Sequence, residues 1–231
     1  MKNYNLFFSE TKKIILLVII LTLLTTLNSF TEQENLPTVQ LEPVEIREYQ
    51  GERLSSLNDF NENAIEGPQR VDINEYMLEI VGLVQETKKY SYQEIMDNFD
   101  HYKKVATLDC VEGWIVKILW EGILVKDLIE KDNIMPKAKI IIFHAYDGYT
   151  TSFPINYILD NNILLAYKAN EIILPPNRGF PFTLVAESKW GYKWIKWVTK
   201  IEISDNEAFR GFWESRGYAN EGDIDKSYLE K

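Results

Sequence analysis

The alternation of hydrophobic and polar residues predicts a domain of several strands and few short helices between residues 71 and 203. Period-two alternation, as from Trp194 to Ile203, is typical of a half-buried strand, and the Ile-rich run from Ala138 to Ala145 is typical of a buried one. Ser91, followed three residues later by Glu94, matches the capping box that begins a helix. Such a pattern indicates an α+β fold with mixed sheets. The predicted strands are residues 71–84 with a break at Gly82, 104–110, 115–120, 138–145, 163–167, 182–186 and 194–203, and the predicted helices lie within 87–102 and at 125–130.

A continuous apolar run from Ile14 to Leu27 precedes the domain, with Lys12 and Lys13 directly before it. Basic residues followed by an uncharged apolar segment are typical of an export signal. The run also approaches the length of about 20 residues that a transmembrane helix needs. Residues 1–30 are therefore interpreted as either a cleaved signal peptide or an uncleaved membrane anchor. Because the positive charge precedes the run, we expect an extracytoplasmic domain, membrane-anchored or secreted.

The segment after the apolar run, residues 31–65, is acidic and shows no sustained hydrophobic period. It contains Pro37 and Pro43. Low hydrophobicity with net negative charge favours either a tether or an ordered arm that lies against the domain. The predicted organisation is a signal peptide or anchor at 1–30, an acidic linker or arm at 31–65, a folded domain at 66–220 and a C-terminal tail at 221–231.

Composition and charge narrow the classes of function. The 231 residues carry a formal net charge of −10, which argues against nucleic acid as the main partner because its phosphates would be repelled. The presence of one cysteine excludes an intramolecular disulfide and a structural zinc site built from several thiolates. The sequence also carries no Gly-x-Ser-x-Gly elbow and no glycine-rich nucleotide-binding loop.

The candidate metal ligands are therefore few. Cys110 lies in the segment from Ala106 to Gly122, where a predicted strand ends at a glycine-containing turn, and it is either a small buried hydrophobic residue or a ligand. His101 follows an acidic helical stretch and is expected at the surface. His144 lies on a predicted buried strand, where it is either a satisfied core residue or a proton carrier that lines a pocket.

Four segments in a fixed order, followed by a fifth, carry a resemblance to a known family. The segments are Leu108–Trp114 (LDCVEGW), Asp147–Tyr149 (DGY), Leu174–Phe182 (LPPNRGFPF), Gly191–Trp197 (GYKWIKW) and Gly211–Tyr218 (GFWESRGY). Taken together, they resemble the molybdopterin-binding domain of the sulfite oxidase family. The similarity is greatest to its short exported members, which include the catalytic subunits of methionine sulfoxide reductases. The resemblance covers about residues 66–220 and implies the mixed-sheet fold of that family.

The resemblance implies a molybdenum–molybdopterin cofactor (Moco). In the family, one cysteine thiolate binds molybdenum beside the dithiolene sulfurs of the pterin, and soft sulfur ligands suit such a metal. In this chain Cys110 is the only candidate for that ligand. The family stretch that contacts the cofactor matches Trp194 to Lys196, with Lys196 as the charged anchor. Asp147 and Tyr149 either face the metal pocket or only form a turn. The candidate catalytic residues are Cys110, Asp147 and Tyr149, the candidate metal ligand is Cys110, and the candidate cofactor-binding residues are Cys110, Arg178, Lys193, Trp194, Ile195 and Lys196.

Two positions depart from the family pattern. Arg178 stands where the family has His or Asn, and Thr183 stands where it has an Arg that helps to bind the cofactor or an anionic substrate. Two interpretations of Arg178 follow: its charge replaces the missing Arg at the cofactor phosphate, or its side chain points to solvent. Cofactor-containing members are normally exported through a twin-arginine signal, whereas this chain carries the pair Lys12 and Lys13.

The family reaction is oxygen-atom transfer at the metal, which cycles by two electrons. The resemblance therefore implies a Moco-dependent oxidoreductase that acts on a small oxyanion or a sulfoxide-type substrate. The sequence contains no Cys-x-x-Cys-His haem motif and no flavin motif, so we expect electron exchange with a separate haem- or quinone-linked partner. We also expect the N-terminal segment to contact the membrane. The alternative is a cofactor-free relative that keeps the fold as an extracytoplasmic binding module.

Overall fold

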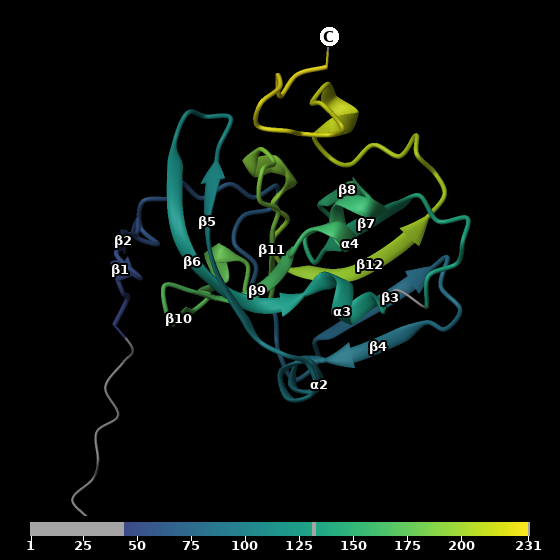
Figure 1. Cartoon of the computed structure of the whole chain (residues 1–231), viewed down its shortest axis with the longest axis horizontal. Helices are drawn as coiled ribbons and strands as arrows, with labels where there is room; N and C mark the ends of the chain where they lie inside the picture. The colour runs from purple at the N-terminus through teal and green to yellow at the C-terminus, as the bar shows by residue number, and fades with distance from the viewer. Residues whose placement is uncertain (1–43, 131–132, 231) are drawn as a thin grey trace, which may run out of the picture. The chain divides into compact units, whose positions relative to one another are not determined.

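The computed structural model describes residues 44–130 and 133–230, which form two main sheets with short helices between the strands (Figure 1). The predicted export segment at residues 1–30 lies outside the described residues. Within the two described ranges, no helix is long and apolar enough to cross a membrane. The predicted α+β fold with mixed sheets is confirmed.

The first sheet is organised around β6 (Ile115–Leu124), which pairs with β5 (Tyr102–Asp109) and β9 (Leu164–Ala169). β6 begins with alternating exposed and buried residues, and its second half is almost continuously buried because both of its faces are covered. β5 and β6 pair antiparallel down to Asp109 opposite Ile115, so residues 110–114 form the loop at that end of the sheet. The remaining strands are β10 (Ile172–Ile173) and β11 (Thr183–Val185), which both pair with β9.

The second sheet mixes parallel and antiparallel pairing around β12 (Val198–Ser204). β12 runs parallel to β3 (Met77–Gly82) and antiparallel to β7 (Ile140–Ala145). The Ile-rich strand β7 is buried along most of its length, as its sequence predicts. A Cβ atom on Gly82 would lie 2.2 Å from the carbonyl oxygen of Ile203, so this close strand contact requires glycine. The outer strands are β4 (Lys88–Ser91) and β8 (Thr150–Pro154).

The helices are short, and the one with the clearest sequence signal begins where that signal predicts. The Ser91 hydroxyl accepts a hydrogen bond from the Glu94 N–H, and the Glu94 carboxylate accepts one from the Ser91 N–H. This capping box satisfies backbone donors at the start of α2 and thereby fixes its first residue. The helices are α2 (Tyr92–Asn98), α3 (Val125–Ile129) and α4 (Ile155–Asp160), the last of which the sequence pattern did not predict.

The predicted strand at residues 194–203 is wrong in its first half. β12 begins only at Val198, and the residues before it form the short 3-10 helix η3 (Gly191–Lys193) and a loop. Trp194 and Trp197 are buried, and their indole N–H groups donate to the backbone carbonyls of Lys189 and of Pro176, the first residue of η2. Trp197 has a φ of 53°, which is incompatible with a regular strand. The two buried tryptophans at this end of the predicted strand therefore reflect ring burial in a loop.

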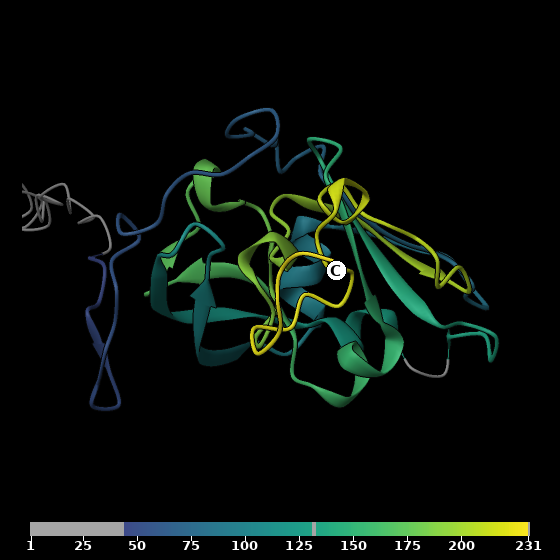
Figure 2. The ribbon, with the colours of Figure 1, turned by 90° about the horizontal axis from the view of Figure 1, so that it is seen from above.

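Residues 44–65 form an ordered arm that is hydrogen-bonded to the first sheet. The Glu45 carboxylate accepts hydrogen bonds from the Leu57 N–H and from the Asn170 side chain, which follows β9. The Ser55 N–H also donates to the carbonyl oxygen of Lys117 on β6 at 2.8 Å. The described part of the acidic segment is therefore not a free tether. The remaining short elements are β1 (Glu48–Tyr49) and β2 (Glu52–Arg53), which form a hairpin at one edge of the molecule (Figure 2), and the 3-10 helices η2 (Pro176–Arg178) and η4 (Glu214–Arg216).

Candidate active site

A cavity of about 570 Å³ lies beside the loop that connects β5 to β6. Its walls come from segments far apart in the sequence: the arm at 60–65, the turn at 147–149, the loop around η3 and the segment at 212–218. A cavity of this volume is typical of a small-molecule or cofactor site. The predicted site residues that line it are Cys110, Asp147, Tyr149, Arg178, Trp194, Ile195 and Lys196, whereas Lys193 is not in the lining.

Cys110 is the first residue after β5 and lines the cavity. Its N–H donates to the Trp114 carbonyl at 3.0 Å, and the Gly113 N–H donates to the Cys110 carbonyl at 2.9 Å, which closes a tight loop. Gly113 has a φ of 89°, a conformation that favours glycine. The cysteine residue is 8% exposed, and burial raises the pKa of its thiol. The free thiol is therefore protonated near neutral pH, and binding to a metal would remove its proton.

The turn after β7 contributes Asp147 and Tyr149. The Asp147 carboxylate accepts a hydrogen bond from the Tyr149 N–H at 3.0 Å, and burial raises the pKa of Asp147. The Tyr149 hydroxyl donates to the carbonyl oxygen of Tyr192 at 2.5 Å, and burial raises its pKa well above the ordinary value. The phenolic proton is therefore committed to the backbone. Of the two side chains in this turn, Asp147 is therefore the one that can gain or lose a proton closer to neutral pH.

Neither histidine lines the cavity. His144 is half-buried on β7, and its Nε2 lies 2.9 Å from the carboxylate of Glu202 on β12. Burial lowers the pKa of His144, although Glu202 opposes that shift. The structure therefore agrees with the first interpretation of His144, a core residue whose ring nitrogen has a hydrogen-bonding partner, and not with a proton carrier that lines the pocket. His101 is exposed, as predicted, and its Nδ1 lies 2.8 Å from the hydroxyl of Tyr167.

Two cations of the cavity wall share one carboxylate from the arm. Arg178 donates from Nε to the Leu57 carbonyl and from Nη2 to the Phe60 carbonyl, both at 3.0 Å. Its Nη1 lies 3.8 Å from Glu62, and Lys196 donates from Nζ to Glu62 at 2.9 Å. Burial lowers the pKa of Arg178 and of Lys196, and Glu62 opposes both shifts. The interpretation that Arg178 points to solvent is therefore wrong, because its guanidinium holds the arm.

The arm also reaches the loop that carries the cysteine. Asn63 places its amide nitrogen 3.2 Å from the Glu112 carboxylate and 3.9 Å from the Cys110 sulfur. The Trp114 indole N–H donates to Glu112 at 3.0 Å, and this hydrogen bond is the largest cause of the lowered pKa of Glu112. The Phe60 ring lies 6.1 Å from the Trp114 ring, centroid to centroid. A carboxylate and two aromatic rings thus line the same cavity as the thiol.

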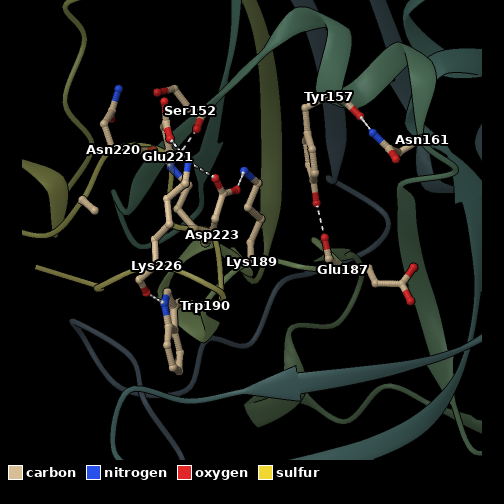
Figure 3. Close-up of polar contacts among 12 residues, drawn as sticks. Ser152, Tyr157, Asn161, Glu187, Lys189, Trp190, Asn220, Glu221, Asp223 and Lys226 are labelled. Carbon is tan, nitrogen blue, oxygen red and sulfur yellow. Dashed lines mark hydrogen bonds and ion pairs between the residues drawn. The ribbon is translucent and has the colours of Figure 1, made fainter.

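The expectation that Lys193 binds a cofactor is corrected by its surroundings. Its side chain is fully buried and donates from Nζ to Glu214 at 2.7 Å, to the Ser152 carbonyl at 2.7 Å and to the Asn220 carbonyl at 2.9 Å. Figure 3 labels Ser152 and Asn220, whose carbonyl oxygens accept two of these hydrogen bonds. Glu214 is also buried and accepts a second hydrogen bond from the Thr151 hydroxyl at 2.6 Å. Lys193 therefore ties η3 to β8 and to the C-terminal segment.

The C-terminal tail contacts Lys189 and Trp190, which directly precede η3, through Asp223 and Lys226 (Figure 3). Lys189 forms an ion pair with Asp223, and Lys226 donates to the same carboxylate at 2.9 Å. The Trp190 indole N–H donates to the Lys226 carbonyl at 3.1 Å. These contacts connect residues 221–230 to the loop that supplies Trp194 and Lys196 to the cavity.

The sequence interpretation missed Glu62, Asn63 and Glu112 as residues of the site. Glu62 and Asn63 lie in a polar segment without a hydrophobic period, so nothing in the pattern places them near the cysteine. Glu112 lies two residues after Cys110 in the same loop, and that proximity was the available signal.

The groups that line the cavity suit a sulfur-ligated metal cofactor with a flat ring system and a phosphate. Cys110 offers a soft ligand, Trp194 offers an aromatic surface, and Arg178 and Lys196 offer positive charge. A Cβ atom on Gly191 would lie 3.2 Å from the carbonyl oxygen of Asp109, a tight contact, so glycine lets the η3 loop approach the end of β5 that directly precedes Cys110.

Most of the described chain matches a known family. Residues 65–213 match the model for the oxidoreductase molybdopterin binding domain. The uncharacterized oxidoreductase YuiH of Bacillus subtilis (strain 168) is 32% identical over 157 residues, which are 68% of this chain and 78% of that protein. The putative protein-methionine-sulfoxide reductase subunit YedZ1 of Azospira oryzae is 28% identical over 150 residues, which are 65% of this chain and 56% of that protein.

A solved structure shares the fold. The sulfane dehydrogenase SoxCD from Paracoccus pantotrophus superposes with a TM-score of 0.59 and 23% identity. The match covers 67% of this chain and 43% of the SoxCD chain. At this level of identity the likeness supports the fold alone.

Proposed function

The chain belongs to the oxidoreductase molybdopterin-binding domain family, of sulfite oxidase type, and we propose that it is a Moco-dependent oxidoreductase that catalyses oxygen-atom transfer. The observation that carries the proposal is the position of Cys110, the single cysteine, in the wall of a cofactor-sized cavity within the matched segment 65–213. The bound cofactor would supply two-electron oxygen-atom transfer, and the protein would hold it and shape the substrate pocket.

Cys110 is proposed as the protein ligand of molybdenum and as a catalytic residue. Because burial raises the pKa of the free thiol, Cys110 would release its proton on binding the metal and would act as a thiolate ligand. The loop closed by Trp114 and Gly113 fixes the direction of the cysteine side chain. Cys110 thereby also connects the cofactor to β5, the strand that it follows.

Four further residues are proposed to hold the cofactor. Trp194 and Ile195 line the cavity directly before Lys196 and supply apolar surface. Lys196 and Arg178 supply the positive charge that a phosphate requires. Arg178 would do so with Nη1, because its Nε and Nη2 already bind the arm. Lys193 is excluded from this group by its buried pair with Glu214.

Asp147 and Tyr149 are proposed to act on the substrate side of the cavity. Asp147 lines the cavity with a raised pKa, which suits a group that holds or releases a proton at the substrate oxygen. Tyr149 acts as a positioning residue, because its hydroxyl is hydrogen-bonded to the Tyr192 carbonyl. The proposed substrate is a small oxyanion or a sulfoxide-type compound, and the name of the relative YedZ1 supports the second class.

Electrons are proposed to pass to or from a separate haem- or quinone-linked partner. The name of YedZ1 supports this, since it describes a subunit. The apolar run from Ile14 to Leu27 supports an extracytoplasmic position in which residues 1–30 contact the membrane or direct export.

The test is an activity assay on the full chain produced in a host that makes the cofactor. Reduction of a methyl sulfoxide and of nitrate is followed with a reduced dye, and oxidation of sulfite with an oxidised one. The wild-type protein should turn over at least one of these substrates, and Cys110→Ser should lose that activity because a hydroxyl is a poor ligand for a soft metal. His144→Gln, which changes a residue outside the cavity lining, is the control that should retain activity. Turnover by Cys110→Ser equal to that of the wild type would refute the proposal.

A further inference from the structure

We propose that Glu62 is a displaceable internal counter-anion, which masks an oxyanion subsite formed by Arg178 and Lys196 until a ligand anion takes its place. This inference rests on the proposed function and assigns a role to the arm. Glu62 is distant in the sequence from the cations that it pairs with, since Lys196 follows it by 134 positions.

The first support is the pairing of the two cations. Arg178 and Lys196 have side chains that are 9% and 19% exposed, and such desolvated cations need a nearby anion. Within residues 44–130 and 133–230, Glu62 is the one carboxylate within ion-pair distance of either cation. The carboxylate oxygens therefore occupy the position that the oxygens of a bound phosphate or similar anion would take.

The second support is the loose attachment of the masking residue. The Glu62 side chain is 29% exposed, and the described residues 61–64 form neither helix nor strand. The distance from Glu62 to Arg178 is 3.8 Å, which is longer than a hydrogen bond, so the guanidinium keeps unused donor capacity at Nη1. A ligand with several charged oxygens can bind both cations at once and thus displace the single carboxylate.

The third support is the charge of the cavity lining. The charged residues of the lining are three acids and two cations, namely Glu62, Glu112, Asp147, Arg178 and Lys196. While Glu62 faces the cations, the lining therefore has one more acid than cations. With Glu62 turned away, the two cations face the cavity with two acids left in the lining. Turning away this one side chain therefore changes the lining from net negative to neutral, which removes the net repulsion of an anion and leaves the two cations free to bind it.

The experiment measures binding of inorganic phosphate to the full chain produced without cofactor. Fluorescence is a suitable signal, because the Lys196 nitrogen lies 4.5 Å from the centre of the Trp197 ring. Glu62→Gln removes the competing charge and should lower the dissociation constant for phosphate by about 10- to 100-fold, the range expected for one charge-assisted hydrogen bond. Glu48→Gln removes the same charge from an exposed position of the same arm that is not in the cavity lining, and it should leave the dissociation constant unchanged.

A second variant ties the effect to the proposed subsite. Adding Lys196→Met to Glu62→Gln should abolish the gain in phosphate affinity. Equal affinity of wild type and Glu62→Gln, or a gain that survives the loss of Lys196, would overturn the proposal. Neither measurement depends on activity, so a protein without molybdenum would refute the proposed function and leave the test of Glu62 intact.

The source of the anion follows from the same titration on Glu62→Gln protein that contains cofactor. Loss of phosphate binding on cofactor incorporation would mean that the cofactor phosphate occupies the subsite. Retained binding would mean that the subsite serves an oxyanion substrate. Both results support a masked subsite and identify the group that uses it.

Discussion

Replacing Lys193 with methionine should destabilise the fold strongly without removing a residue of the cavity lining. Lys193 and Glu214 have no exposed side-chain surface and pair at 2.7 Å, so the substitution leaves a buried carboxylate without its counter-charge. Removing one partner of a buried ion pair costs about 3–5 kcal/mol. For a domain of this size each kcal/mol corresponds to about 2–4 °C, so the melting temperature should fall by about 6–20 °C.

Urea denaturation followed by tryptophan fluorescence measures this loss. The variants Lys193→Met, Glu214→Gln and their combination form a double-mutant cycle, and the combination should recover part of the loss because no unpaired charge stays buried. Lys200→Met is the matched control, because that lysine is 34% exposed and lies 3.8 Å from Glu202. Its effect should stay below about 1 kcal/mol. A free energy of unfolding for Lys193→Met within about 1 kcal/mol of wild type would refute the reasoning.

Three further predictions concern the arm, the cysteine and the position of the domain. Arg178→Ala should loosen the arm at Leu57 and Phe60 and lower cofactor content, since it removes charge-assisted hydrogen bonds worth about 1.5–3 kcal/mol each. A rate of proteolysis of the arm and a cofactor content after dialysis that both equal those of the wild type would contradict this. Because burial raises the pKa of Cys110, iodoacetamide should alkylate the cofactor-free protein more slowly at pH 8 than it alkylates a small thiol. The rate should increase as the pH rises. A rate equal to that of the small thiol would contradict the burial argument. Protease added to intact cells or spheroplasts should digest the domain, and full protection until lysis would show that it is cytoplasmic.

The elements that the sequence predicted well are those whose signal is local. The Ile-rich run of β7 and the capping box of Ser91 and Glu94 each need only neighbouring residues to define the element. The segment around Cys110 was also predictable, because the strand, the glycine turn and the cysteine lie within a few residues. The order of the motifs indicated the family, which the comparisons confirm.

The parts that the sequence did not predict depend on contacts between distant segments. Lys193 stands beside residues that line the cavity, yet its side chain turns to Glu214, which folds back from the C-terminal segment. Trp194 and Trp197 lie in a segment whose pattern predicted a strand, but their indole hydrogen bonds stabilise a loop. Glu62 lies in a polar segment whose position is set by Arg178, and no local pattern encodes that contact. Tertiary contacts decide each of these cases.

The central claim, that Cys110 holds a molybdenum cofactor, is tested most directly by metal analysis of the purified full chain. Protein from a cofactor-making host should contain molybdenum in an amount equimolar to the chain. Cys110→Ser should bind much less metal, because it loses the soft protein ligand. When both proteins are compared without cofactor, its unfolding curve should stay close to that of wild type, because Cys110 lines the cavity and bound cofactor would itself stabilise the wild type. Wild-type protein without molybdenum, or Cys110→Ser with the same molybdenum content as wild type, would contradict the claim.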